Sequence, residues 1–431
     1  MIPTSLDRLL CQRRTLMLQG PMGPFFQRLA GTLRAHGQQV WKVNFNAGDD
    51  WFFDDEQVIR FQDPLEQWPA RLRRLVTELR IDALVLFGQS RHMHQAAIRE
   101  AKSLDVQVFV FEEGYVRPDY VTLEVGGVNA ESPLPRDPAF YRDLNAEPLP
   151  PPQPTGQRFG AVAAAAITYS LARSFGHHRY PHYRHHRSIA PIKQGLKWAN
   201  GAWRKWWYRL TERRMQDFLG APAQHKRFFL VPLQVYNDSQ IRRHSPFKDV
   251  PAFIREVMAS FAQHAETDKL LVFKHHPLDR PYNDYASLIA RAARSLGIAD
   301  RVHYIHDQHL PTMLKHAAGV VTVNSTTGLQ SLYHSTPVIP LGECMYAIEG
   351  LVHPGPLESF WRNPGPVDAE LFHNFRTYLV RDSQLNASFY GAAPGLPSIT
   401  ETKRRRASAA ESPSALPQAA TWSAPTRPTL K

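Results

Sequence analysis

The stretch FFLVPLQVYNDSQ at residues 228–240 is an apolar run that ends abruptly in polar side chains. The pattern recurs where residues 270–273 lead into KHHP at 274–277, and where residues 319–323 lead into NSTTG at 324–328. Short apolar runs bounded by turn residues are typical of strands buried in a parallel sheet. Ligands of open α/β sheets bind outside the carboxyl ends of the strands. The three strand ends therefore predict one polar pocket, which is suited to an anionic ligand.

Strands and helices also alternate in the first part of the chain. We expect strands at residues 15–18, 39–45, 83–87 and 106–111 and helices at about 25–36, 64–78 and 94–103. This alternation predicts a doubly wound parallel sheet, and it restarts between about residues 214 and 380. The predicted fold class is therefore α/β and GT-B-like, with two Rossmann-like parallel-sheet domains that face a cleft. Glycosyltransferases and sugar-nucleotide epimerases share this layout, so it does not fix the function.

Composition divides the chain into four segments. Residues 1–147 form the predicted N-terminal Rossmann-like domain, and residues 221–391 form the C-terminal one. Between them, residues 148–220 begin with a proline-rich linker and continue as a basic, aromatic insert. Residues 392–431 are rich in Ser, Pro, Ala and basic residues, which predicts a disordered tail.

Length, charge and cysteine content narrow the class of protein. The 431 residues exceed what one ordinary core holds, and the formal charge of +12 favours anionic partners. Two cysteines, Cys11 and Cys344, leave no disulfide framework and fit a reducing cytosol. The sequence has no signal-peptide core and no apolar stretch of the ~20 residues that span a bilayer. We therefore expect a cytoplasmic protein that is soluble or peripheral.

The insert combines cations with aromatic side chains. Residues 173–214 contain eleven Lys or Arg residues against one acid, Glu212, and four tryptophans lie among them. In a helix, Trp203 and Trp207 would share one face. A basic helix with an aromatic face fits an anionic membrane surface. The alternatives are a solvated insert whose tryptophans pack on the C-terminal domain, and a nucleic-acid site, which we do not expect.

Asp238 follows the first of the three strand ends, with Gln234 and Gln240 around it. It is either a helix N-cap or a functional acid. At the second strand end, Lys274 supplies a cation and His276 a proton near neutral pH, which together are able to neutralise a departing phosphate. Pro277 ends that strand. A metal site is not expected, because no ligand spacing is complete.

The third strand end is a hydroxyl-rich turn into a predicted helix, formed by Asn324, Ser325, Thr326, Thr327 and Gly328. Backbone N–H groups at such a turn bind anions, and the alternative is simple capping by Ser325 or Thr326.

Two further turns in the first half carry candidate residues. Gly20 and Gly23 in the first loop match neither the P-loop nor the dinucleotide spacing, so they are a weak signal. Glu112 and Glu113 close the fourth strand, with Arg117 just after them. Two carboxylates that converge in a dry cleft cannot both ionise easily, so one is a candidate general base or acid. The alternative is a solvated acidic turn.

Together these residues resemble the bacterial capsule polysaccharide biosynthesis family, the capsular Kdo transferases. The stretches that carry the resemblance are QGPMGPFF at 19–26, KVNFN at 42–46, FEEGYVRP at 111–118, QVYNDSQI at 234–241, His276-Pro277 and STTG at 325–328. They span residues 15–345. Among these transferases the chain is most like the enzyme that adds the first β-Kdo to (lyso)phosphatidylglycerol.

The resemblance implies a GT-B fold, CMP-β-Kdo as donor, retention of configuration, and no cofactor or metal. It makes residues 1–147 the acceptor side and residues 221–391 the nucleotide-sugar side. Asp238 would be the nucleophile, His276 would protonate the CMP phosphate near Lys274, and Glu113 or Glu112 would deprotonate the acceptor. Substrate-binding roles are implied for Gln234, Lys274, Pro277, Asn324, Ser325, Thr326, Thr327, Gly20, Gly23, Asn44 and Arg117.

The implied partners are CMP-Kdo, an anionic phospholipid acceptor at the inner-membrane surface, and capsule biosynthesis and export proteins. Two alternatives stay open at this point. One is a different nucleotide-sugar transferase or an epimerase on the same scaffold. The other is a non-catalytic component of capsule export.

Overall fold

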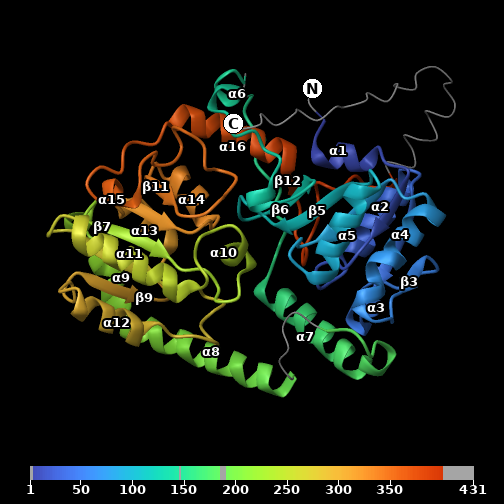
Figure 1. Cartoon of the computed structure of the whole chain (residues 1–431), viewed down its shortest axis with the longest axis horizontal. Helices are drawn as coiled ribbons and strands as arrows, with labels where there is room; N and C mark the ends of the chain where they lie inside the picture. The colour runs from blue at the N-terminus through green and yellow to red at the C-terminus, as the bar shows by residue number, and fades with distance from the viewer. Residues whose placement is uncertain (1–2, 145–146, 185–190, 401–431) are drawn as a thin grey trace.

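The structure is a computed structural model that describes residues 3–144, 147–184 and 191–400. Two sheets lie side by side, each covered by helices, and two long helices run along one edge of both (Figure 1). The first unit contains a seven-stranded sheet and the second a five-stranded sheet. This confirms the predicted α/β, GT-B-like fold class.

The sheet of the first unit has the strand order β12-β6-β5-β4-β1-β2-β3. Its strands are β1 (Arg14–Met17), β2 (Gln39–Asn44), β3 (Val58–Arg60), β4 (Ala83–Phe87), β5 (Gln107–Glu113), β6 (Tyr120–Val125) and β12 (Gln384–Asn386). Strands β1 to β5 are parallel, but β6 is antiparallel to β5 and β12 is antiparallel to β6. The prediction of a purely parallel sheet is therefore wrong at this edge. The connection from β5 to β6, residues 114–119, is too short for a parallel crossover.

The helices of the first unit lie close to the predicted positions, with short additional ones. They are α1 (Ser5–Leu10), α2 (Phe25–Ala35), α3 (Ala47–Phe52), η1 (Leu65–Gln67), α4 (Trp68–Leu79), α5 (His92–Ser103), η2 (Asn129–Glu131) and α6 (Pro138–Arg142).

The sheet of the second unit is parallel throughout, in the order β11-β10-β7-β8-β9. Its strands are β7 (Phe228–Pro232), β8 (Leu270–Lys274), β9 (Val302–Ile305), β10 (Gly319–Thr322) and β11 (Val338–Pro340). Its helices are α9 (Arg213–Gly220), η4 (Pro222–Gln224), α10 (Ser239–Arg243), α11 (Val250–His264), α12 (Ala286–Ser295), α13 (Leu310–His316), α14 (Thr327–Tyr333) and α15 (Leu357–Phe360). Strand β7 lies between β10 and β8, so the three strand ends found in the sequence are neighbours.

The chain returns to the first unit after α15. Helix α16 (Ala369–Ser383) packs against α6 and β6, and β12 extends the first sheet. The predicted second domain, residues 221–391, therefore ends too late, because its last elements belong to the first unit. The predicted tail begins at residue 392, and residues 401–431 lie outside the described residues.

The insert between the units is helical and contacts both of them. It consists of α7 (Phe159–Phe175), η3 (His177–Arg179) and α8 (Pro191–Thr211). On the first unit, the hydroxyl of Tyr169 donates to Asp49 Oδ1 at 3.0 Å. On the second, Arg204 Nη1 donates to the carbonyl oxygen of Arg280 at 3.0 Å.

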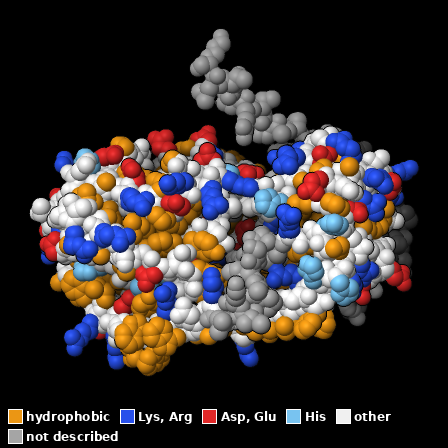
Figure 2. Space-filling model, turned by 60° about the horizontal axis from the view of Figure 1, so that its bottom comes forward, with side chains coloured by type: hydrophobic (Ala, Val, Ile, Leu, Met, Phe, Trp, Pro, Cys, Tyr) orange, Lys and Arg blue, Asp and Glu red, His pale blue; other side chains and the backbone are white. Residues whose placement is uncertain are grey.

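The tryptophans of α8 face away from the second unit. The rings of Trp203 and Trp207 stack with centroids 5.8 Å apart, which confirms that they share a helix face. Trp203 is 56% exposed and Trp207 46%, so the alternative in which the tryptophans pack on the C-terminal domain is wrong. Figure 2 shows hydrophobic side chains mixed with lysines and arginines on this face of the molecule. Among the described helices, none is long and apolar enough to cross a membrane.

Gly328 lies in the first turn of α14, against the ring of Tyr346. A Cβ at position 328 would lie 2.1 Å from the Tyr346 hydroxyl, which also donates to Ser325 O. We expect Gly328→Ala to lower the free energy of unfolding by about 2 kcal/mol, because the ring has to move in a packed core. Chemical denaturation followed by tryptophan fluorescence measures it.

Gly160→Ala is the matched control. A Cβ at Gly160 in α7 meets no atom within 4 Å, so that variant should lose no stability. Equal stability of both variants would show that the Tyr346 ring accommodates a Cβ at position 328 without cost, which would contradict the prediction.

Candidate active site

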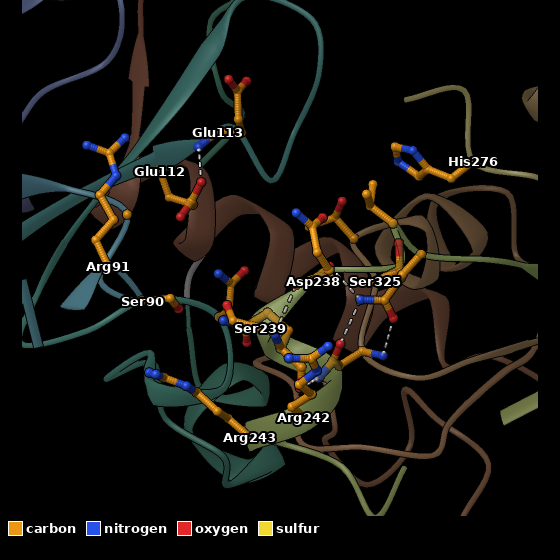
Figure 3. A pocket seen from close by; sticks show the side chains of 18 of the residues that line it. Ser90, Arg91, Glu112, Glu113, Asp238, Ser239, Arg242, Arg243, His276 and Ser325 are labelled. Carbon is orange, nitrogen blue, oxygen red and sulfur yellow. Dashed lines mark hydrogen bonds between the residues drawn. The ribbon is translucent and has the colours of Figure 1, made fainter. Parts of the chain in front are cut away.

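A cavity of about 630 Å³ lies between the two units. Strand ends from both sheets supply its walls, with Arg91 and Glu112 on one side and Asp238, Ser325 and His276 on the other (Figure 3). It is lined by nine of the residues predicted from the sequence, namely Glu112, Glu113, Arg117, Gln234, Asp238, His276, Asn324, Ser325 and Thr326. The predicted convergence of three strand ends on one polar pocket is therefore confirmed.

Six predicted residues are described but lie outside this cavity: Lys274, Pro277, Thr327, Gly20, Gly23 and Asn44. Lys274 is buried, and its ammonium donates to the carbonyl oxygen of His306 at 3.0 Å. Burial also lowers the pKa of Lys274. Lys274 therefore does not line the cavity, although its charge still acts on His276.

The other five predicted residues lie outside the cavity, at positions that serve packing, backbone conformation or the ends of elements. Asn44 is fully buried and donates to Asp50 Oδ1 at 3.0 Å. A Cβ at Gly20 would lie 2.7 Å from the Phe26 ring, so Gly20 serves packing, and Gly23 has a φ of +130° that favours glycine. Thr327 begins α14, and Pro277 is exposed beyond β8.

Asp238 is both an N-cap and a cavity residue. Its Oδ1 accepts from the backbone N–H of Gln240 at 2.9 Å, and its Oδ2 accepts from Gln234 Nε2 at 3.0 Å. The same Gln234 amide donates to Asn324 Oδ1 at 3.1 Å, which ties the end of β7 to the end of β10. The carboxylate is therefore held in one orientation by groups on two strands.

The surroundings of His276 favour the neutral ring. Burial, followed by the charges of Lys274 and Arg117, lowers its pKa to about 4. These effects oppose the predicted proton on His276 near neutral pH. The backbone N–H of Leu278 donates to His276 Nδ1 at 3.1 Å, which makes Nε2 the protonated nitrogen of the neutral ring. A bound anion would oppose these effects and raise the pKa.

Glu112 is the carboxylate most perturbed by the cavity. Burial raises its pKa to about 7, with a further increase from the neighbouring charge of Glu113. Glu112 Oε1 accepts from the backbone N–H of Glu113 at 3.1 Å. The pKa of Glu113 is also raised by burial, and Arg117 opposes that rise. The expectation that one acid of the pair is poised for proton transfer fits Glu112.

Ser325 and Thr326 lie at the start of α14. Thr326 is the N-cap of α14, but its side chain makes no capping hydrogen bond. Ser325 Oγ accepts from the backbone N–H of Thr327 at 3.1 Å. Both side chains line the cavity.

Three arginines of the cavity were not predicted as site residues. Arg91 follows β4, and Arg242 and Arg243 lie on α10. The signal for Arg91 was present, since it follows a strand end of the same kind as the others. With Arg117 they give the cavity a strong attraction for anions. Among the residues the structure describes, no group of three or more His, Cys, Asp or Glu side chains is placed to hold a metal ion.

The raised pKa of Glu112 is directly measurable. We expect an infrared band of a protonated carboxylic acid that titrates with a midpoint near pH 7, because burial penalises the charged form. Glu112→Gln should remove the component that titrates near pH 7 and leave that of buried Glu124, whose pKa is raised to about 8. Glu56→Gln, at an exposed position, should leave both unchanged. A midpoint near 4.5 in the wild-type protein would show that the carboxylate is solvated.

Comparison with known proteins places the chain in a family. Residues 82–390 match the family model described as capsule polysaccharide biosynthesis protein. The chain is 40% identical over 386 residues to the capsule polysaccharide export protein KpsS of Escherichia coli, covering 90% of this chain and 99% of that protein. It is 40% identical over 382 residues to the capsule polysaccharide modification protein LipB of Neisseria meningitidis serogroup B, covering 87% and 91%.

A solved structure described as Thermosulfurimonas dismutans KpsC, beta Kdo 2,7 transferase, aligns with 84% of this chain and 89% of its own, at 14% identity and a TM-score of 0.39. The family match and the two sequence relatives cover most of the chain, including both walls of the cavity. The protein belongs to the capsule polysaccharide biosynthesis protein family.

Proposed function

We propose that this protein is a glycosyltransferase that moves Kdo from CMP-β-Kdo to a (lyso)phosphatidylglycerol acceptor, with retention of configuration. Its product would prime capsule polysaccharide synthesis and export. The observation that carries the proposal is the single cavity in which the acid at 238, the imidazole at 276 and the hydroxyls at 325–326 meet two glutamates of the opposite unit.

The charges of the cavity suit the donor. CMP-Kdo carries a carboxylate and a phosphodiester, and the cavity offers Arg117, Arg242 and Arg243 besides Arg91. Ser325 and Thr326 supply hydroxyl donors for the phosphate. The volume of about 630 Å³ is within the range of small-molecule sites.

His276 would act on the leaving group. Its neutral ring offers Nε2–H as a donor, and an approaching phosphate would raise the pKa of the ring. Proton uptake would therefore accompany donor binding. Transfer of that proton from His276 to the phosphate oxygen as the bond to Kdo breaks would stabilise the departing CMP and leave the imidazole neutral.

Asp238 would be the nucleophile in a double displacement. One of its oxygens would form an ester bond to the anomeric carbon of Kdo while CMP leaves with the bonding electron pair. The acceptor hydroxyl would then displace Asp238, and a carboxylate would take its proton. Two inversions give net retention. The hydrogen bonds from Gln234 and Gln240 fix the direction of the attacking carboxylate.

Glu112 is the better candidate for the base. A pKa of about 7 lets it accept a proton from the acceptor and lose it again near neutral pH. Glu113, which lies at the same strand end, is the second candidate.

The exposed face of α8 would place the protein at the cytoplasmic side of the inner membrane. Trp203, Trp206 and Trp207 are exposed among Lys205 and Arg209. Aromatic rings that insert at the headgroup level and cations that attract anionic lipid give a peripheral association. Capsule biosynthesis and export proteins are the partners expected at that surface.

The first test is transfer itself. Purified protein with CMP-Kdo and lysophosphatidylglycerol should release CMP and form a Kdo-lipid, detected by mass spectrometry. Asp238→Asn should lower kcat by at least about 10³-fold, because Asn keeps the cap but is not a nucleophile. CMP should raise the melting temperature of both proteins, and UDP should not.

Asp238→Ser separates capping from chemistry in the same assay, since Ser is also a good N-cap. It should fold like the wild type and be equally inactive. Wild-type turnover in either variant would remove Asp238 from the reaction. Protection by UDP in place of CMP would favour another nucleotide-sugar enzyme.

The second test concerns the membrane. Binding to vesicles that contain phosphatidylglycerol should weaken about tenfold in a Trp203→Ala/Trp207→Ala variant, because the inserted rings are lost. Sedimentation with vesicles measures it. Trp51→Ala is the control, since Trp51 is also exposed but lies on α3 of the first unit. Equal losses in both variants, or none, would contradict this role for α8.

A further inference from the structure

A second cavity adjoins the candidate active site. It has a volume of about 500 Å³, and Arg91 and His92 line both cavities. Its walls come from η1 and the start of α5 in the first unit and from residues 181–184 of the insert. A molecule that fills it would therefore reach the active site along Arg91.

The second cavity combines cations with apolar surface. Arg184 and His182 of the insert line it together with Arg91 and His92 of the first unit, and Glu66 is the one carboxylate among its described lining residues. Leu65 and Met93 contribute apolar side chains. Such a lining fits a ligand with an anionic group next to a hydrocarbon chain.

The wall between the two cavities is held in place by a buried amide. Gln19 Oε1 accepts from Arg91 Nη1 at 2.7 Å, and Gln19 Nε2 donates to the hydroxyl of Tyr183 at 3.3 Å. Gln19 Nε2 also donates to Asp49 Oδ2 at 3.0 Å. One fully buried side chain thus fixes the arginine of the first unit and the tyrosine of the insert relative to each other.

Arg91 also lies next to the candidate base. A Cβ at Gly88 would lie 3.9 Å from Glu112 Oε2 and 4.0 Å from Arg91 Nε, so the carboxylate and the guanidinium flank the same glycine. A phosphate bound at Arg91 would place a hydroxyl a few bonds away within reach of Glu112.

We propose that the second cavity binds the acceptor as a single phospholipid molecule, with its phosphodiester between Arg91, His182 and Arg184 and the start of its acyl chain against Leu65 and Met93. The terminal glycerol hydroxyl then extends past Arg91 to Glu112. This inference rests on the proposed function for the identity of the acceptor. One wall of the cavity belongs to the insert, whose helices also carry the exposed Phe175 and the tryptophans of α8.

The test is direct binding of a fluorescent lysophosphatidylglycerol below its critical micelle concentration. The Kd of the full-length His182→Ala/Arg184→Ala variant should rise at least about tenfold, while the affinity for CMP changes less than about twofold. Arg99→Ala, at an exposed position of α5 outside both cavities, should bind like the wild type. Thermal melting of each variant checks that it is folded.

Two further ligands define what is bound. A neutral monoacylglycerol with the same chain should bind at least about tenfold more weakly than the anionic lipid, and glycerophosphoglycerol without a chain should compete poorly. Equal binding of anionic and neutral lipids, equal competition by the chainless head group, or an unchanged Kd in the double variant would each overturn the inference.

The outcome is distinguishable from that of the proposed function. Lipid binding that depends on His182 and Arg184, without any Kdo transfer, would keep the lipid site and reject the donor assignment. Kdo transfer with an acceptor KM that is unchanged in the double variant would keep the transferase and reject this site.

Discussion

The parallel pairing of β7 with β10 on one side and β8 on the other is the constraint on which the candidate site depends. Parallel neighbours end at the same edge of a sheet, so polar residues at three separate places in the chain must meet there. The Gln234 amide joins two of these ends by bonding to Asp238 and Asn324. Asp238 is thus positioned by the topology of the sheet and then oriented by its neighbours.

The first unit supplies the opposing wall in the same way, from residues at and after the ends of its neighbouring strands β4 and β5. The charges of the cavity therefore come from both walls. Glu112 at the end of β5 is surrounded by protein that removes water, so its pKa is raised, whereas the charges of Lys274 and Arg117 add to burial in keeping His276 neutral. Burial thus favours the uncharged forms of both Glu112 and His276. A nearby anion would raise both pKa values and so favour the protonated forms.

The sequence was sufficient for seven of the twelve described strands and for nine cavity residues, because a buried parallel strand is marked by a continuous apolar run and its end by a polar break. It was insufficient where side-chain direction decides. Lys274 adjoins the same strand end as His276 but points into the protein, and Asn44 completes a buried network around Asp50. The return of α16 and β12 to the first sheet depends on contacts between residues more than 200 positions apart, which no local pattern reports. In the sequence, Arg242 and Arg243 resemble the exposed charged face of a helix. They line the cavity only because the first unit lies opposite the second.

The insert links these parts, since it is bound to each unit by different chemistry. Tyr169 and Tyr180 hold it to Asp49 and Asp50 of the first unit through hydroxyl–carboxylate hydrogen bonds. At its other end, the ring of Tyr208 stacks on His306 of the second unit with centroids 3.6 Å apart. Because residues 181–184 lie between these attachments, the second cavity exists only while the insert is docked on the first unit. The same segment therefore carries the aromatic surface, forms one wall of the second cavity and spans the two units. The proposed contact with a lipid surface and the proposed path to Glu112 would both depend on the hydrogen bonds that hold this segment in place.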